Sequence, residues 1–390
     1  MSDLYDVIVV GLGAMGSATA YHLARRGARV LGLEQFAPGH TLGSSHGDSR
    51  IIRELYFENP LYVPLVQRAY TLWALLEEEA ATVLVHRTGG LMIGRPSSSL
   101  VHGALRSGES HGLPAPVLSP EEIRTRFPAF HLPADFVAVW DERAGYLNPE
   151  ACTSAHAALA ERSGAVLHYN EPVTHWIPDG NGVRVTTPAG VYRAARLVIC
   201  AGAWTKTMLA ELELPLVVER QVLVWLDAPR PRALYSASKF PIFICELEDA
   251  TQFYGFPLLD RGVKTSVFHE GRLNESPHNV DRDVVPADVG TLRARLANVL
   301  PDLASAAVRE TATCLFTNTP DQHFLIDFHP HHSQVLLSSP CSGHGFKFAS
   351  ALGEVQAELL LDGRSNLDLR PFSLSRFRSE LRPGVSTGQD

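Results

Sequence analysis

The sequence predicts a mixed α/β fold in which a Rossmann-like dinucleotide-binding domain is interleaved with a second domain built on a mixed sheet. A β-branched run at residues 6–10 precedes a glycine-rich turn and a helical stretch at 14–26, as in a strand–turn–helix nucleotide site. A hairpin and buried strand predicted at 182–204 resume the same domain after a long excursion. Because the excursion contains strand-like runs of its own, we expect the two domains to be interleaved.

Composition and charge exclude several classes of partner. The 390 residues are 45% hydrophobic and 19% charged, the balance of a globular protein. A net charge of −8 argues against a nucleic-acid partner, and no apolar run is long enough to span a membrane. The five cysteines are odd in number and lack metal-site spacing, and the N-terminal sequence has no basic region or cleavage site. We therefore expect a cytoplasmic protein with unpaired thiols and no metal site.

The first turn contains the residue types of a dinucleotide site. Three glycines have the spacing that allows a tight turn, close approach of a pyrophosphate and close helix packing: Gly11, Gly13 and Gly16. Ala14 and Met15 begin the predicted helix, whose amides would face the pyrophosphate. Glu34 follows the second predicted strand, residues 30–33, where its carboxylate can bind both ribose hydroxyls. An acid at this position disfavours a 2′-phosphate and leaves NAD and FAD as the choices.

The segments that follow Glu34 favour FAD. A nicotinamide dehydrogenase normally continues with another helix and strand, whereas residues 35–53 form a loop rich in glycine, serine and histidine. The nucleotide-binding half resumes at 182–204, in a strand that ends near Gly202. An interrupted and resumed nucleotide domain is typical of FAD-dependent oxidoreductases.

A second glycine-rich turn lies near the C-terminus. Gly343 and Gly345 precede a predicted helix at 346–361, which begins with Phe346. The positive end of this helix would face the flavin pyrimidine ring and favour the negative charge of the reduced ring. The alternative is an ordinary strand–turn–helix packing unit.

These segments also predict the domain boundaries. We expect an FAD-binding domain made of residues 1–86, 147–215 and 313–390. The remaining segments, 87–146 and 216–312, are expected to form the substrate domain.

The chain resembles the monomeric sarcosine oxidase family, which includes N-methyltryptophan oxidase and pipecolate oxidase, over essentially its whole length. The resemblance is carried by DVIVVGLGAMGS, GSSHGDSRIIRELY, FYGFP with the following Lys264, CLFTNTPDQHFLID and SGHGFKFAS. It implies a flavoprotein architecture of the glutathione-reductase or D-amino-acid-oxidase type, in a monomer. It also implies FAD attached through its 8α carbon to the sulfur of Cys314, for which the alternative reading is a packing cysteine.

The resemblance implies an oxidase of a secondary-amine amino acid. Family members move a hydride equivalent from the carbon next to nitrogen to the flavin, water hydrolyses the imine, and oxygen is reduced to hydrogen peroxide. N-methyl substrates also yield formaldehyde. Arg53 and Lys347 match the family's carboxylate clamp. Arg50 and Lys264 match cations near the flavin, and Lys264 matches the residue that activates oxygen. Arg50 and Lys347 are also expected to contact the cofactor.

Two positions of the expected substrate pocket depart from the sarcosine oxidase pattern. Tyr254 and His269 are candidates for lining this pocket, but His269 follows Lys264 by five residues where sarcosine oxidases have four. Phe316 stands where sarcosine oxidases have a tyrosine. Sarcosine itself is therefore in doubt as the substrate. Further cofactor contacts are expected at Ser45, His46, Ser49 and Val173.

Three alternative functions remain at this point. The first is an FAD-dependent amino-acid dehydrogenase that passes electrons to an acceptor other than oxygen. The second is an enzyme like a D-amino-acid or glycine oxidase. The third is a nucleotide-binding scaffold without turnover, against which the clustered basic residues argue.

Overall fold

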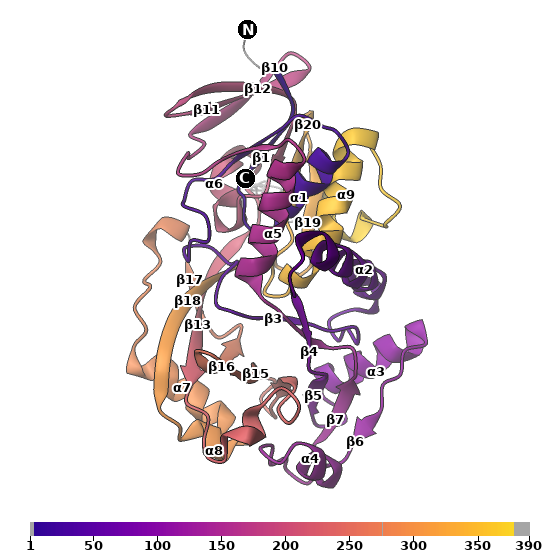
Figure 1. Ribbon diagram of the computed structural model, residues 1–390, viewed down its shortest axis with the longest axis vertical. Helices are drawn as coiled ribbons and strands as arrows, with labels where there is room; N and C mark the ends of the chain where they lie inside the picture. The colour runs from indigo at the N-terminus through magenta and orange to yellow at the C-terminus, as the bar shows by residue number, and fades with distance from the viewer. Residues whose placement is uncertain (1–3, 275, 378–390) are drawn as a thin grey trace, which may run out of the picture.

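Two β-sheets organise the chain in the computed structural model, which describes residues 4–274 and 276–377 (Figure 1). The first sheet lies in the upper part of the view, and the second sheet lies in the lower part. Of the expected FAD-binding segments, residues 1–3 and 378–390 lie outside the described residues.

The first sheet contains the strand that precedes the expected nucleotide turn. Its strands are β1 (Leu4–Val10), β2 (Val30–Leu33), β9 (Val166–His168), β10 (His175–Asp179), β11 (Gly182–Thr187), β12 (Gly190–Ile199), β19 (Leu325–His329) and β20 (His332–Ser339). The main path runs β10-β11-β12-β1-β2-β9, and β20 pairs with both β12 and β19. The predicted hairpin at 182–204 is confirmed, because β11 and β12 are antiparallel and close on a Thr187–Gly190 pair.

Alternation along β1 places apolar side chains on both faces of this sheet. Val7 and Val9 pack into the core beneath the helices, whereas Ile8 and Val10 belong to a separate core on the other face. A strand buried on both faces reads as a continuous apolar run, which is why residues 6–10 predicted a parallel central strand.

The helices of the first half form a tight layer. Helix α1 (Ala14–Arg25) packs against both α5 (Pro149–Arg162) and α9 (Ala349–Asp362), and α2 (Val63–Ala80) packs against α9 (Figure 1). Gly353 of α9 allows the close approach, because a Cβ there would lie 2.6 Å from the backbone carbonyl carbon of Ala18. The helix predicted at 346–361 begins as a 3-10 turn, Phe346–Phe348, and becomes α-helical at Ala349.

The second sheet supplies the other half of the molecule. Its strands are β5 (Gly90–Gly94), β6 (Val117–Leu118), β7 (Val137–Asp141), β13 (Val217–Leu226), β14 (Ile242–Glu246), β15 (Gln252–Leu259), β16 (Gly262–Phe268), β17 (Arg272–Asn274) and β18 (Val308–Asn318). The order is β17-β13-β16-β15-β14-β5-β7-β6, with β18 on β13. The sheet is mixed as predicted, since β5 and β14 are parallel and β13 pairs antiparallel with β18. Its helices are α3 (Ser99–His111), α4 (Pro120–Arg126), α7 (Pro286–Leu296) and α8 (Pro301–Ala304).

A small third sheet connects the two halves. It consists of β3 (Arg50–Ile52), β8 (Gly145–Leu147) and β4 (Val85–Arg87), with β8 in the centre. The short helix α6 (Thr205–Met208) follows β12. The expected boundary at 312/313 falls inside β18, which pairs with β13 from Val308 to Asn318, so Cys314 belongs to a strand of the second sheet.

Candidate active site

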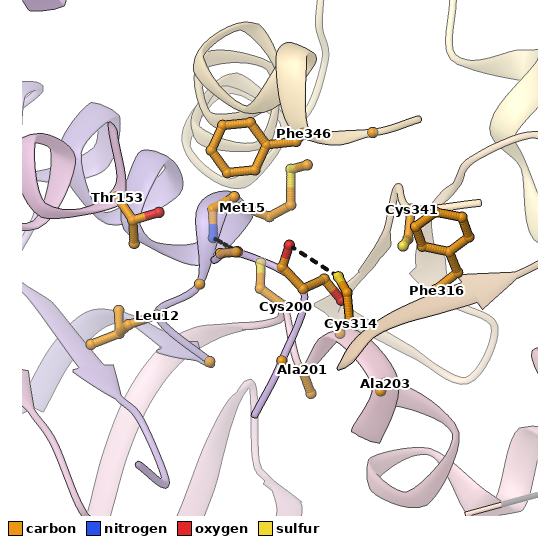
Figure 2. A pocket seen from close by; sticks show the side chains of 18 of the residues that line it. Leu12, Met15, Thr153, Cys200, Ala201, Ala203, Cys314, Phe316, Cys341 and Phe346 are labelled. Carbon is orange, nitrogen blue, oxygen red and sulfur yellow. Dashed lines mark hydrogen bonds between the residues drawn. The ribbon is translucent and has the colours of Figure 1, made fainter. Parts of the chain in front are cut away.

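A cavity of about 420 Å³ is lined by residues of both halves. It reaches from Glu34, at the end of β2, to Arg53 and Lys347. In Figure 2, Met15 and Thr153 lie on one side of the cavity and Cys341 and Phe316 on the other, with Cys314 between them. The cavity therefore contains the expected nucleotide turn, the expected thiol and both residues of the expected clamp.

The nucleotide end is a backbone cradle. Gly11 has φ +88°, and a Cβ there would lie 2.5 Å from the carbonyl oxygen of Cys200. Gly13 caps α1 with extended backbone and no side-chain hydrogen bond. The Ala14 amide donates to Ser45 Oγ at 3.1 Å, which fixes the 36–49 loop above the helix end. Such a helix N-terminus favours an anionic group.

Glu34 is buried at the edge of this cradle. Its carboxylate accepts hydrogen bonds from the amides of Leu12, at 2.8 Å, and Phe36, at 3.1 Å. These bonds hold the carboxylate at the end of β2 and leave further lone pairs for ribose hydroxyls.

Most of the expected cofactor residues line the cavity. Those that do are Gly11, Gly13, Ala14, Met15, Glu34, Ser45, Arg50, Val173, Gly202, Cys314, Gly343, Gly345, Phe346 and Lys347. Gly16, His46 and Ser49 do not. Gly16 instead supports the turn, because a Cβ there would lie 1.7 Å from the carbonyl oxygen of Gly11.

Cys314 lies beside a cation. Its side chain is 2% exposed, and its sulfur lies 3.4 Å from Arg50 Nη2. The same Arg50 nitrogen donates to the Ser44 carbonyl at 2.8 Å. The sulfur thus faces a positive charge inside the cavity.

Two buried cations lie at the far end of the cavity. Arg53 Nη2 contacts both carboxylate oxygens of Glu58 at 2.5 Å, and its Nε has no hydrogen-bond partner among the described residues. Lys347 Nζ donates to the His344 carbonyl at 2.6 Å. Burial, with a smaller contribution from Arg53, lowers the pKa of Lys347 to about 7. The structure thus brings together the two residues expected to bind a carboxylate.

Lys264 lies outside the set of cavity-lining residues. Its ammonium is 1% exposed and donates to the carbonyls of Gly47 and Ser49, each at 2.6 Å. Burial lowers its pKa well below the usual lysine value, and Arg50 lowers it further. Two of the three N–H donors are therefore used to hold the loop that carries His46.

Of the two residues expected to line the substrate pocket, only one lines the cavity. Tyr254 lines the cavity, and its ring packs 5.2 Å from that of Phe268. His269 does not line it; its Nδ1 lies 3.2 Å from Glu219 Oε2, and its backbone has φ +54°. Phe268 and Phe316 line the cavity instead, with ring centroids 5.7 Å apart.

Three functional candidates were missed from the sequence. Glu58 and Tyr56 follow Arg53 on the same segment, and His344 lies inside the second glycine-rich turn. Tyr56 OH lies 2.5 Å from His344 Nδ1. An acid five residues after the predicted clamp arginine is a usable signal, whereas the Tyr56–His344 contact joins positions 288 residues apart.

A family model described as "FAD dependent oxidoreductase" matches residues 6–359. This chain belongs to that family. The oxidoreductase is 44% identical to "Monomeric sarcosine oxidase" of Streptomyces avermitilis over 93% of this chain and 95% of the relative. It is 36% identical to "N-methyl-L-tryptophan oxidase" of Escherichia coli K12 over 96% of this chain and the whole relative.

Solved structures share the fold of this oxidoreductase. NikD, described as an unusual amino acid oxidase essential for nikkomycin biosynthesis, matches with TM-score 0.82 and 25% identity, covering 95% of this chain and 98% of NikD. L-proline dehydrogenase from P. horikoshii matches with TM-score 0.84 and 21% identity, covering 97% and 99%. The expected D-amino-acid-oxidase type of architecture is thereby confirmed.

The cavity of the oxidoreductase fits FAD. Gly11 gives the tight turn its left-handed backbone, the α1 N-terminus faces the cavity, and Glu34 can bind ribose. The cavity then continues to Cys314 and the two cations, which gives the flavin ring a place beyond the nucleotide.

The described residues contain neither a metal-binding cluster nor a membrane-spanning helix. Among residues 4–274 and 276–377, no group of three or more His, Cys, Asp or Glu side chains could hold a metal ion. No helix within the same residues is long and apolar enough to cross a bilayer.

Proposed function

We propose that this oxidoreductase is an oxidase of secondary-amine amino acids, N-methyl or cyclic, that passes electrons to oxygen. The observation that carries the proposal is the pair of buried cations, Arg53 and Lys347, at the end of a cavity with the residues of an FAD site. The names of the two relatives support the same substrate class.

The reaction combines the cofactor's chemistry with groups of this chain. Bound FAD supplies the acceptor for the hydride equivalent that leaves the carbon next to nitrogen, and oxygen then yields hydrogen peroxide. For an N-methyl substrate, one water and one oxygen molecule convert the substrate to the primary amine, formaldehyde and peroxide. The protein has to bind the carboxylate, orient the amine and exclude bulk water.

Arg53 and Lys347 bind the substrate carboxylate in this proposal. Arginine offers a bidentate fork and lysine a point charge, and both are desolvated here. Glu58 contacts only Nη2 of Arg53, and Nε has no partner among the described residues, so a substrate carboxylate can bind Nε and has to share or replace Glu58 at Nη2. A bound carboxylate would restore the charge of Lys347, whose pKa burial lowers to about 7.

The proposal also assigns specific roles to Cys314 and Lys264. Cys314 holds FAD covalently through its sulfur, which is supported by its place in the cavity and by the Arg50 guanidinium 3.4 Å away. Lys264 serves the oxygen reaction through its third N–H donor, supported by its buried charge beside the 47–49 loop. We further propose a cytoplasmic monomer, in keeping with cysteines that are all free.

A peroxide-release screen tests the function. N-methyl and cyclic amino acids should release peroxide under air, and each should be oxidised much faster than its decarboxylated amine. Arg53→Ala or Lys347→Ala should remove most of this difference, because a charge-assisted hydrogen bond contributes about 1.5–3 kcal/mol. Lys239→Ala, at an exposed lysine, is the matched control.

Three results of the peroxide screen would contradict parts of the proposal. Substrate-dependent reduction of the flavin without peroxide would indicate a dehydrogenase with another acceptor. Preference for glycine or D-amino acids would indicate a primary-amine oxidase. Equal rates on amino acid and amine in the parent enzyme would remove the carboxylate role of Arg53 and Lys347.

A further inference from the structure

One aromatic ring lies beside both cations of the cavity. The centroid of the Tyr56 ring is 4.3 Å from Arg53 Cζ and 5.2 Å from Lys347 Nζ. Tyr56 is 0% exposed, so water does not screen these contacts. A ring face attracts a cation without neutralising it, unlike the Glu58 carboxylate, which also contacts Arg53.

The position of this ring is fixed by its hydroxyl. Tyr56 OH lies 2.5 Å from His344 Nδ1, and His344 Nε2 lies 3.0 Å from the carbonyl of Gln322. A carbonyl only accepts, so Nε2 carries the imidazole proton and Nδ1 accepts from Tyr56. Burial lowers the pKa of His344 to about 3, which keeps the ring neutral.

His344 also contacts the second cation through its backbone. Its carbonyl accepts from Lys347 Nζ at 2.6 Å, and the Lys347 carbonyl accepts from Trp73 Nε1 at 2.8 Å. Tyr56, His344 and Lys347 therefore form one connected unit, and the face of Tyr56 extends that unit to Arg53.

We propose that Tyr56 is a positioning residue for carboxylate recognition: the Tyr56–His344 hydrogen bond fixes the ring that sets the separation and direction of Arg53 and Lys347. This inference rests on the proposed function, in which these two cations bind the substrate carboxylate. It assigns to Tyr56 no contact with the reacting atoms.

A second tyrosine provides a matched control. Tyr62 is also 0% exposed and also bonds a histidine, with its OH 2.9 Å from His323 Nδ1. Its ring lies 4.9 Å from that of Tyr56, and neither tyrosine lines the cavity. The two differ in their cations: among the described residues, Arg53 and Lys347 contact the ring of Tyr56 and not that of Tyr62. Tyr62→Phe removes a buried tyrosine–histidine bond of the same kind but keeps the Tyr62 ring and leaves the Tyr56–His344 bond in place.

The test compares Tyr56→Phe and Tyr62→Phe in the FAD-loaded enzyme. With Tyr56→Phe, KM for an N-methyl amino acid should rise about tenfold, the effect of one lost hydrogen bond, while kcat changes far less. KM for the decarboxylated amine should stay the same. The dissociation constant of acetate, read from the flavin absorbance spectrum, should rise by a similar factor. Tyr62→Phe should leave all three constants near the parent values.

Several results would overturn the inference. Unchanged acetate binding in Tyr56→Phe would do so, as would the same kinetic pattern in both variants, which indicates loss of stability alone. If Tyr56→Phe does not fold, His344→Leu removes the same bond from its other end and should give the same rise in KM. A parent enzyme that neither binds acetate nor prefers the amino acid would reject the carboxylate role and this inference together. A parent that does both, with an unaffected Tyr56→Phe, would reject only the inference.

Discussion

At the residue scale, the site is distinguished by buried positive charge. Arg53, Lys264 and Lys347 are 2%, 1% and 4% exposed. Burial of an unpaired charge is costly, so each cation has oxygen atoms facing it. Glu58 pairs with Arg53, and backbone carbonyls face both lysines. Because carbonyls carry no net charge, the two lysines remain able to respond to an anion.

The thiol of Cys314 gives the first prediction at this scale. If its sulfur holds the flavin, acid-precipitated protein should stay yellow, and Cys314→Ala should release its FAD on precipitation. Cys341→Ala is the matched control, since Cys341 also lines the cavity, and it should retain the colour. The measurement is flavin absorbance in pellet and supernatant; a colourless pellet from the parent protein would contradict the covalent link.

Lys264 gives the second prediction. Lys264→Met keeps the bulk of the stem and removes the charge, so oxidation of the reduced enzyme by oxygen should slow about a hundredfold or more, the scale of a lost preorganised electrostatic group. Anaerobic reduction by substrate should change much less. Lys239→Met, at an exposed lysine, should alter neither step. Stopped-flow absorbance separates the two steps, and the reverse pattern would assign Lys264 to substrate binding.

At the element scale, close helix contacts set the position of the cavity walls. Helix α1 carries the nucleotide turn and α9 follows the second glycine-rich turn, and the two pack directly on each other. Their separation therefore fixes the distance between the two ends of the cofactor site.

Gly353 tests this contact. Gly353→Ala should lower the free energy of unfolding by about 1–3 kcal/mol, because the new Cβ meets the backbone of Ala18 at 2.6 Å and the helices must move apart. Gly290→Ala is the control: Gly290 lies in α7 with open space around it, and should gain up to about 1 kcal/mol from helix propensity. Urea unfolding monitored by circular dichroism measures both. A neutral Gly353→Ala would show that the α1–α9 contact adjusts freely.

At the scale of the whole molecule, several histidines are buried in the neutral form. Burial lowers the pKa of His22 to about 4, and lowers that of His46 to about 3. Burial also holds the pKa of His156 well below 6.5, and neither of its ring nitrogens has a partner among the described residues. These groups bind protons more readily in the unfolded chain.

The sign of the resulting pH dependence follows from linkage. The contribution of these neutral histidines to the free energy of unfolding should be fully present above pH 6.5 and should fall as the pH is lowered toward 4.5. The reason is that the unfolded state takes up protons that the folded state excludes. His156→Gln should flatten this fall, whereas His102→Gln, at an exposed histidine, should leave it unchanged. Thermal unfolding between pH 7 and 4.5 decides this, and identical slopes in all three proteins would contradict the role of His156.

Local sequence patterns are sufficient to predict the nucleotide half of this protein. The glycine spacing, the acid at Glu34 and the apolar run of β1 are local patterns, and each follows from backbone geometry within about one strand–turn–helix unit. The family match and the clustering of Arg53, Lys347 and Cys314 in one cavity agree with the same local motifs.

The partners of the buried side chains, in contrast, depend on how distant segments pack together. Lys264 reaches the carbonyl of Gly47 across 217 positions of sequence, and Tyr56 reaches His344 across 288. His269 turns to Glu219 rather than into the cavity, although the family resemblance made it a candidate for the pocket. Periodicity fixes where a strand or helix lies along the chain, but the partner of a buried polar group depends on which distant element packs against it.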